Sequence, residues 1–209
     1  MKVAMLNKKQ FAGVLLLSVL IAACSDSPKT EAEKKPERPP EPVTGRQAFQ
    51  MMYPQARRWA ADAEPLQLRS VNLAQVKSEK GKAGAWQAVF VSPSQAKART
   101  YSYSAVEAGG SLHEGVFPGQ EEAYSGTSGS TPFSIAAIKI DSDQAYETAA
   151  KQSAEYTRKN AGKPVSFLLE QNKRFADVSW RVIWGESVGT SDYSVFVDAS
   201  TGAYLATAH

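Results

Sequence analysis

One pattern occurs twice in this chain and constrains its fold more than any other feature: a helix-forming segment followed by alternating strands. The first helix pattern begins at Thr44 and the second at Asp141, and in each a glutamine stands three positions later. This is the spacing of a capping box, in which the N-cap side chain and the glutamine satisfy N–H groups at the helix start. Apolar residues then recur every three or four positions, as on one face of a helix.

Pro54 interrupts the first helix pattern before that pattern ends at Pro65. Proline lacks the N–H that a helix interior needs, but it is tolerated in the first turn of a helix. Two interpretations remain open. Either the helix bends at Pro54, or a short turn ends at Tyr53 and the main helix begins at Pro54. We favour the second interpretation.

Four strands are predicted after each helix pattern, because apolar and polar residues alternate there. They lie around residues 66–73, 86–90, 101–105 and 112–117 in the first half, and around 165–169, 176–184, 193–197 and 203–207 in the second. Trp86 and Trp180 stand at matching strand positions. Further landmark pairs keep a near-constant offset of roughly 90 residues, which indicates an internal duplication.

The predicted fold class is therefore α+β. Strands joined by short turns pair antiparallel, and each helix is expected to cover one sheet face. We predict two helix-plus-four-stranded antiparallel sheet repeats, at residues 44–117 and 135–209. A connection rich in glycine and serine, residues 118–134, joins them.

The first 23 residues are typical of a secretory signal peptide. Lys2, Lys8 and Lys9 give a positive start, and the apolar run at 11–23 is shorter than the roughly twenty residues that a membrane-spanning helix needs. The segment is therefore expected to direct export and to be removed.

The end of this segment, Ile21-Ala22-Ala23-Cys24, resembles the bacterial lipobox. The resemblance implies that Cys24 is lipidated and becomes the mature N-terminus. Several acyl chains anchor a protein far more firmly than the reversible attachment that one chain gives. The alternative is an ordinary cleavage near Ala23, which would leave a free, oxidisable thiol. Ser25, rather than aspartate, resembles the pattern for export to the outer membrane of a Gram-negative cell, facing the periplasm.

Residues 24–43 form the predicted tether between the lipid anchor and the folded part. Five of the eleven prolines lie in this segment, among charges of both signs and almost no apolar side chains. Such a segment cannot bury enough surface to offset the entropy of ordering, and its prolines keep it extended. The alternative is a proline-rich ligand for another module.

The charge of the mature chain excludes one class of partner. The sequence has 24 Lys and Arg against 21 Asp and Glu, and three of the basic residues precede Cys24. The mature protein is therefore neutral, and composition gives no argument for nucleic-acid binding. Because Cys24 is the only cysteine, no internal disulfide can form, and a packed core must supply the stability.

The sequence offers no convincing catalytic or metal site. Its two histidines, His113 and His209, have no other ligand type near them, and no Gly-x-Ser-x-Gly motif occurs. Asp141 and Asp143 could form a carboxylate pair, but Asp141 already serves as a helix cap. Arg57-Arg58 and Glu121-Glu122 are interpreted as solvated pairs. We therefore expect no enzyme activity, no metal and no cofactor.

The second half resembles a PepSY domain. The resemblance is carried by Asp143–Ala149 in the helix, by Ser179–Val182 in the middle strand, and by Tyr193–Gly202 with its closing Val-Asp-x-x-Thr-Gly turn. The first half departs from this pattern, because Glu107-Ala-Gly-Gly stands where the turn is expected. The resemblance implies an extracytoplasmic, non-enzymatic domain of the kind that is sometimes attached to peptidases and restrains them.

A binding surface is predicted on the sheet face opposite the helices. Apolar residues there stand beside an arginine, which is the composition of a recognition surface. The predicted binding residues are Val89, Val91, Arg181, Ile183 and Phe196. The alternative is that the connection 118–134, or the sheet of the other half, covers these residues as a second small core.

Three classes of function follow from these predictions. The leading one is a lipid-anchored extracytoplasmic binding module that recognises or restrains an envelope protein such as a peptidase. The second is a structural or accessory lipoprotein of an outer-membrane assembly, and an enzyme is a distant third. The expected partners are the membrane, through the lipid on Cys24, and a protein of the cell envelope.

Replacing Cys24 with serine tests the anchor. We expect the Cys24→Ser protein to move from the detergent-rich phase to the aqueous phase in detergent partitioning, because the thiol that carries the acyl chains is gone. The matched Ser27→Ala change should leave partitioning unaltered. Unchanged recovery of Cys24→Ser in the membrane fraction would refute the lipobox interpretation.

Overall fold

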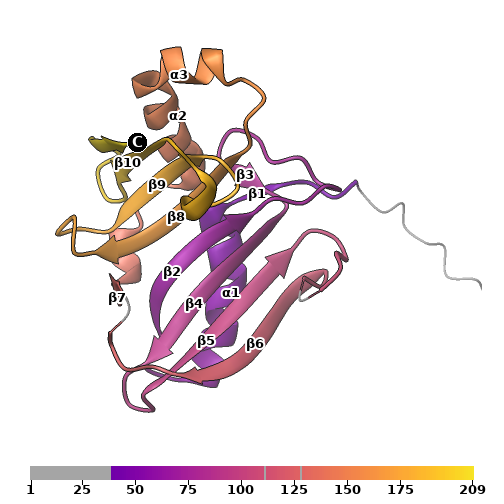
Figure 1. Ribbon diagram of the computed structural model, residues 1–209. Coiled ribbons are helices and arrows are strands. Elements are labelled where there is room, and N and C mark those ends of the chain that lie inside the picture. The colour runs from indigo at the N-terminus through magenta and orange to yellow at the C-terminus, as the bar shows by residue number, and fades with distance from the viewer. Residues whose placement is uncertain (1–38, 111, 128) are drawn as a thin grey trace, which may run out of the picture. The chain divides into compact units, whose positions relative to one another are not determined.

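The computed structural model describes residues 39–209, with the exception of residues 111 and 128 (Figure 1). The predictions for the signal peptide, for Cys24 and for most of the tether therefore lie outside the described residues. All structural statements below concern the described part of the chain.

The described residues form a series of helices and strands that follows the predicted order closely. The helices are α1 (Gly45–Trp59), α2 (Ser142–Gln152), α3 (Ala154–Lys159) and the 3-10 turns η1 (Ile135–Ala137) and η2 (Val188–Thr190). The strands of the first half are β1 (Val43–Thr44), β2 (Glu64–Val71), β3 (Lys82–Ala83), β4 (Ala85–Ser92), β5 (Lys97–Ser104) and β6 (Gly115–Ala123). The remaining strands are β7 (Ser130–Thr131), β8 (Val165–Asn172), β9 (Ser179–Trp184), β10 (Ser194–Asp198) and β11 (Tyr204–Ala208).

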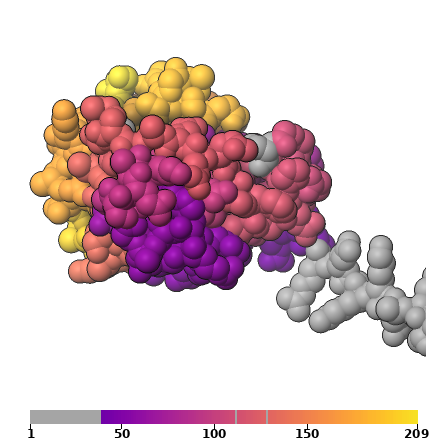
Figure 2. Space-filling view, turned by 90° about the horizontal axis from the view of Figure 1, so that it is seen from below, coloured from indigo at the N-terminus to yellow at the C-terminus, as the bar shows by residue number. Residues whose placement is uncertain are grey.

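A nine-stranded antiparallel sheet organises the described part of the chain (Figure 1). Its strand order is β11-β10-β9-β8-β2-β4-β5-β6, with β7 paired to the end of β8, while β1 and β3 form a separate pair. Few helices and one large antiparallel sheet confirm the α+β class. The two predicted sets of four strands do not form two sheets, because β2 and β8 pair with each other. Segments from the two halves also adjoin on the surface in Figure 2.

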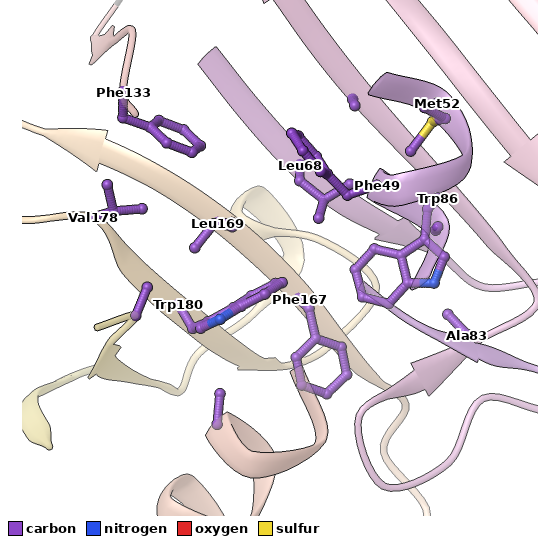
Figure 3. Close-up of a cluster of buried hydrophobic side chains, with 14 of the residues drawn as sticks. Phe49, Met52, Leu68, Ala83, Trp86, Phe133, Phe167, Leu169, Val178 and Trp180 are labelled. Atoms are coloured by element: carbon purple, nitrogen blue, oxygen red, sulfur yellow. The ribbon is translucent and has the colours of Figure 1, made fainter. Parts of the chain in front are cut away.

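Helices α1 and α2 cover one face of the sheet, and the main core lies between these two helices and that face. From α1, Phe49, Met52 and Ala56 are buried against strands of the first half. From α2, Ala145 and Ala149 are buried against strands of the second half. The two sets merge into one cluster, because Phe167 of β8 packs against Trp86 of β4 with ring centroids 6.2 Å apart. Figure 3 shows these side chains converging from both halves.

The N-termini of α1 and α2 meet over the centre of the sheet. The predicted capping boxes at Thr44 and Asp141 are both present. Ser142 Oγ accepts the Gly45 N–H at 2.7 Å, and Asp141 Oδ1 accepts the Arg46 N–H at 2.9 Å. The second helix start therefore also satisfies orphan N–H groups of the first.

Two tryptophans lie beneath this junction, one from each half. The indole N–H of Trp86 donates to Val43 O at 3.0 Å, and that of Trp180 donates to Ile140 O at 2.9 Å. In both cases the acceptor is the residue before the helix N-cap. The two rings touch edge to face, with centroids 6.4 Å apart. Each helix start is thus tied to the strand on which it packs.

Pro54 lies inside α1, so the favoured interpretation, in which the helix begins at Pro54, is wrong. Proline removes the hydrogen bond to the carbonyl four residues earlier, which belongs to Gln50. Both Pro54 and Gln50 are exposed, so water can reach that carbonyl.

Strand β6 extends to Ala123, into the segment predicted as the connection 118–134, and β7 takes two more of its residues. The glycine- and serine-rich composition of the segment predicts a connection, and 118–122 also contains a proline. Strand β6 lies at the edge of the sheet, where a residue facing solvent needs no backbone N–H for a neighbouring strand, so proline is tolerated. The pairing of β5 with β6 also shifts register between Arg99 and Tyr101, opposite Pro118.

The helix junction generates a stability prediction. Asp141→Ala removes the acceptor that caps α2 and binds the Arg46 N–H, so we expect a loss of about 2 kcal/mol in the free energy of unfolding. Asp143→Ala is the matched control, because its carboxylate accepts only the adjacent Gln144 N–H. The control should lose less than about 0.5 kcal/mol. Equal midpoints for both variants in urea unfolding would contradict the proposed importance of the junction.

Candidate functional site

The structure separates the five predicted binding residues into two places on the sheet. All five lie on the face away from α1 and α2, which we call the open face. Val89 and Val91 belong to β4, whereas Arg181, Ile183 and Phe196 belong to β9 and β10, and strands β8 and β2 lie between them. Arg181 and Phe196 are direct partners across β9 and β10.

The predicted apolar patch is not exposed. Val91, Ile183 and Phe196 are 0%, 2% and 3% exposed, and Val89 is half-buried. The ring of Phe175, in the loop between β8 and β9, packs 5.0 Å from the ring of Phe196. Neither the connection 118–134 nor another sheet supplies this contact. Alternation in a strand indicates which face a residue occupies, but not what a neighbouring loop places over it.

A groove of about 640 Å³ opens instead at the middle of the open face, and we call it the central groove. Its floor comes from β2, β4, β8 and β9, and its walls come from the loops after β5 and β9. The residues that define it are Arg69, Gln87, Leu168 and Ile183 on the floor, and Leu112 and Gly189 on the walls. Its volume lies in the range of pockets that hold small molecules or peptide side chains.

The floor of the central groove is amphipathic. Leu168 and Ile183 give it apolar surface, and Arg69 gives it a positive charge. The Arg69 guanidinium donates to Gln87 Oε1 from Nε at 3.0 Å and from Nη2 at 2.6 Å. Ser166 donates its hydroxyl to Gly185 O at 2.7 Å. The polar side chains are therefore held in place by neighbours, which suits recognition better than proton transfer.

A second pocket of about 690 Å³ lies on the other side of the Asn72 loop, between that loop and α3. The Asn72 side chain donates to Glu186 Oε2 at 2.9 Å, and both residues line both pockets. Asn72 Oδ1, Ser78 Oγ and Thr157 Oγ1 are buried around this pocket with no hydrogen-bond partner within the described residues. Unmet polar atoms of this kind favour water or a polar ligand nearby.

An ion pair borders the second pocket. Lys163 Nζ lies 2.9 Å from Asp192 Oδ1 and donates to the Tyr156 hydroxyl at 2.9 Å. The hydrogen bonds from Lys163 and Tyr156 lower the pKa of Asp192 to about 2. The hydrogen bonds that Lys163 donates to Tyr156 and to Asp192 raise the pKa of Lys163, and the bond to Tyr156 has the larger effect. Both groups therefore keep their charges at neutral pH and are poor proton donors or acceptors for catalysis.

The other sequence candidates for chemistry have structural partners. His113 Nδ1 lies 2.7 Å from Glu107 Oε1, and Glu121 accepts from Lys97 and from the indole of Trp59. Glu121 is exposed, as predicted for a solvated pair, but it lies in strand β6 rather than in a loop and has partners on neighbouring elements. No group of three His, Cys, Asp or Glu that could hold a metal ion occurs within the described residues.

Sequence reasoning missed the central groove. Arg69, Gln87 and Leu168 carry no motif, and they come together only because β2 pairs with both β4 and β8. The strand alternation did place Ile183 on the correct face. No signal in the sequence indicated that β2 and β8 are neighbours.

Among residues 39–209, apart from the two undescribed positions, no helix combines the length and the apolar character that crossing a membrane requires.

Comparisons with known proteins give one likeness of fold. No protein-family model matches this chain, and no curated protein sequence matches it. Among solved structures, the crystal structure of a "putative lipoprotein" from Clostridium difficile 630 matches with a TM-score of 0.53 and 12% sequence identity. The match covers 82% of this chain and 95% of that chain. At this identity the likeness concerns the fold: this chain shares an α+β fold, with few helices and a large antiparallel sheet, with that protein.

Proposed function

We propose that the chain is a lipid-anchored, extracytoplasmic binding module of the bacterial cell envelope, and that its central groove holds a segment of an envelope protein. The observation that carries this proposal is the groove itself, which is concave, amphipathic and built on the central strands of the sheet. The lipobox at Cys24 supports the anchor, and the description of the structural neighbour as a lipoprotein agrees with it.

The side chains of the groove favour binding over catalysis. A nucleophile needs a base within hydrogen-bond reach and a third group that orients the base. In the described groove, Ser166 bonds to a backbone carbonyl and Arg69 bonds to a glutamine. Such fixed donors position a partner without requiring a reaction.

We also propose that the two halves are copies of one PepSY-like unit. The matched bonds from Trp86 and Trp180 to the residues before the two N-caps support this relationship. The strand order supports it as well, because each half contributes four successive strands outward from the β2–β8 pair. The groove would then be a new site that neither copy has alone.

The tether gives the module its reach. If residues 24–43 are extended, as their composition predicts, then at up to about 3 Å per residue they would carry the domain roughly 60 Å from the lipid. An anchored domain on such a tether can search the space next to the outer membrane for its partner. We propose the periplasmic side of the outer membrane as its location.

Blocking the groove tests the function. Gly189 lies on the wall of the groove, and a side chain there would meet no atom within 4 Å. We expect Gly189→Trp to fold normally and to lose crosslinking to its partner in envelope preparations, because the indole fills the groove. Gly129→Trp is the matched control, since Gly129 is exposed, equally unobstructed and outside both pockets.

Equal crosslinking by the wild type, Gly189→Trp and Gly129→Trp would overturn the groove as the binding site. Recovery of one stoichiometric partner that only Gly189→Trp loses supports the proposal. Recovery of a multi-subunit membrane complex, independent of Gly189, would favour the role of a structural lipoprotein.

A further inference from the structure

A single row of cross-strand partners runs over the open face and through the central groove. Residues directly opposite each other on paired strands share a face, so the register identifies the row. From β10 to β6 its members are Phe196, Arg181, Leu168, Arg69, Gln87, Ser102 and Phe117. Within the row, Arg181 and Arg69 therefore flank Leu168.

Neither arginine of the row forms an ion pair within 4 Å of an acidic side chain in the described residues. Arg69 is exposed, and its guanidinium bonds to Gln87. Arg181 is half-buried, and its Nε donates to Ser194 Oγ at 2.9 Å. The guanidinium groups of Arg181 and Arg174 both approach the ring of Phe196, at 5.1 and 4.6 Å from its centroid. Three positive charges thus gather on this part of the open face.

The nearest acidic groups are already engaged. The carboxylate of Glu170, two positions after Leu168 along β8 and therefore on the same face, accepts from Gln67, Ser130 and Asn172. On the wall of the groove, Glu186 accepts from Asn72. Burial, together with the neighbouring charge of Arg174, lowers the pKa of Arg181, while Glu170 acts in the opposite direction. An anionic group placed beside Arg181 would stabilise the charged guanidinium, which burial and Arg174 disfavour.

The spacing of the row suits a peptide. Neighbouring strands lie about 4.8 Å apart, so Arg69 and Arg181, two strands apart, are separated by roughly 10 Å at the backbone. An extended peptide rises about 3.3 Å per residue, so acidic residues two to four positions apart can reach both guanidinium groups. The guanidinium fork binds carboxylate oxygens in pairs. Leu168, between the arginines, offers contact to an apolar side chain.

We propose that the partner segment is acidic and follows the row out of the central groove. In the groove a carboxylate binds Arg69 and an apolar side chain contacts Leu168. A second carboxylate binds Arg181, which does not line the groove but is the cross-strand partner of Leu168. This proposal rests on the proposed function and adds the chemistry of the partner. A protein segment fits better than a membrane surface, because Arg69 lies on the floor of a groove between two loops. A flat bilayer is held away from such a floor by the walls.

A labelled peptide tests the charge directly. The probe is a twelve-residue peptide of alternating glutamate and leucine, and the control peptide carries glutamine in place of glutamate. We expect fluorescence anisotropy with the detergent-solubilised full chain to show binding of the glutamate peptide only. The affinity should fall as salt is raised, because exposed charge pairs are screened.

Variants locate the binding to the row. Arg69→Gln with Arg181→Gln should weaken the glutamate peptide at least tenfold, because both paired charges are lost. Arg57→Gln with Arg58→Gln is the matched control, since both arginines are exposed on α1. Arg69→Gln alone keeps the test decisive if the change at half-buried Arg181 disturbs folding. This single variant should weaken binding at least threefold.

Three outcomes would overturn the acidic-partner proposal. The first is equal binding of the glutamate and glutamine peptides. The second is that Arg57→Gln with Arg58→Gln weakens binding of the glutamate peptide as much as Arg69→Gln with Arg181→Gln does. The third is that the glutamate peptide does not bind, whereas anionic phosphatidylglycerol vesicles bind in a manner that depends on Arg69. The proposed function can survive each of them. If crosslinking is lost in Gly189→Trp but kept in the Arg69 and Arg181 variant, the groove binds a partner and only its acidic character is refuted.

Discussion

Strands β2 and β8 pair through residues 67–69 and 168–170, and this contact makes one sheet out of two sets of strands. On the helix side, it brings Phe167 against Trp86 and allows Trp86 and Trp180 to touch. The two helix starts then meet above these rings, where Ser142 satisfies the Gly45 N–H. Without the central pair, each half would expose an unpaired strand and half of an aromatic core.

The same pairing creates the groove on the open face. Arg69 and Leu168 are neighbours only across this strand pair, and each wall of the groove belongs to a different half. The binding properties that we propose are therefore properties of the joined domain. This agrees with a general feature of ligand sites, which tend to form where structural units meet rather than within one unit.

Local signals predicted much of this fold, and non-local contacts account for the rest. The caps at Thr44 and Asp141 were predictable because a capping box lies within four residues of sequence. Alternation likewise predicted which residues of β4 and β9 face the helices. Two features depend on contacts between segments far apart in sequence, which local patterns do not reveal. Phe196 is buried under Phe175, and Arg69 lies opposite Leu168. Cys24, outside the described residues, remains a prediction from sequence alone.

The central strand pair also dictates an order of events as the chain folds. The partners that close the sheet are far apart in sequence: Phe167 N donates to Ser70 Oγ across 97 positions. Loop closure over such distances is slow compared with hairpin formation. When the chain is synthesised from its N-terminus to its C-terminus, β2 therefore emerges with an open edge long before β8 arrives. During this interval the open edge of β2 can pair with other chains, so the chain is then most exposed to aggregation.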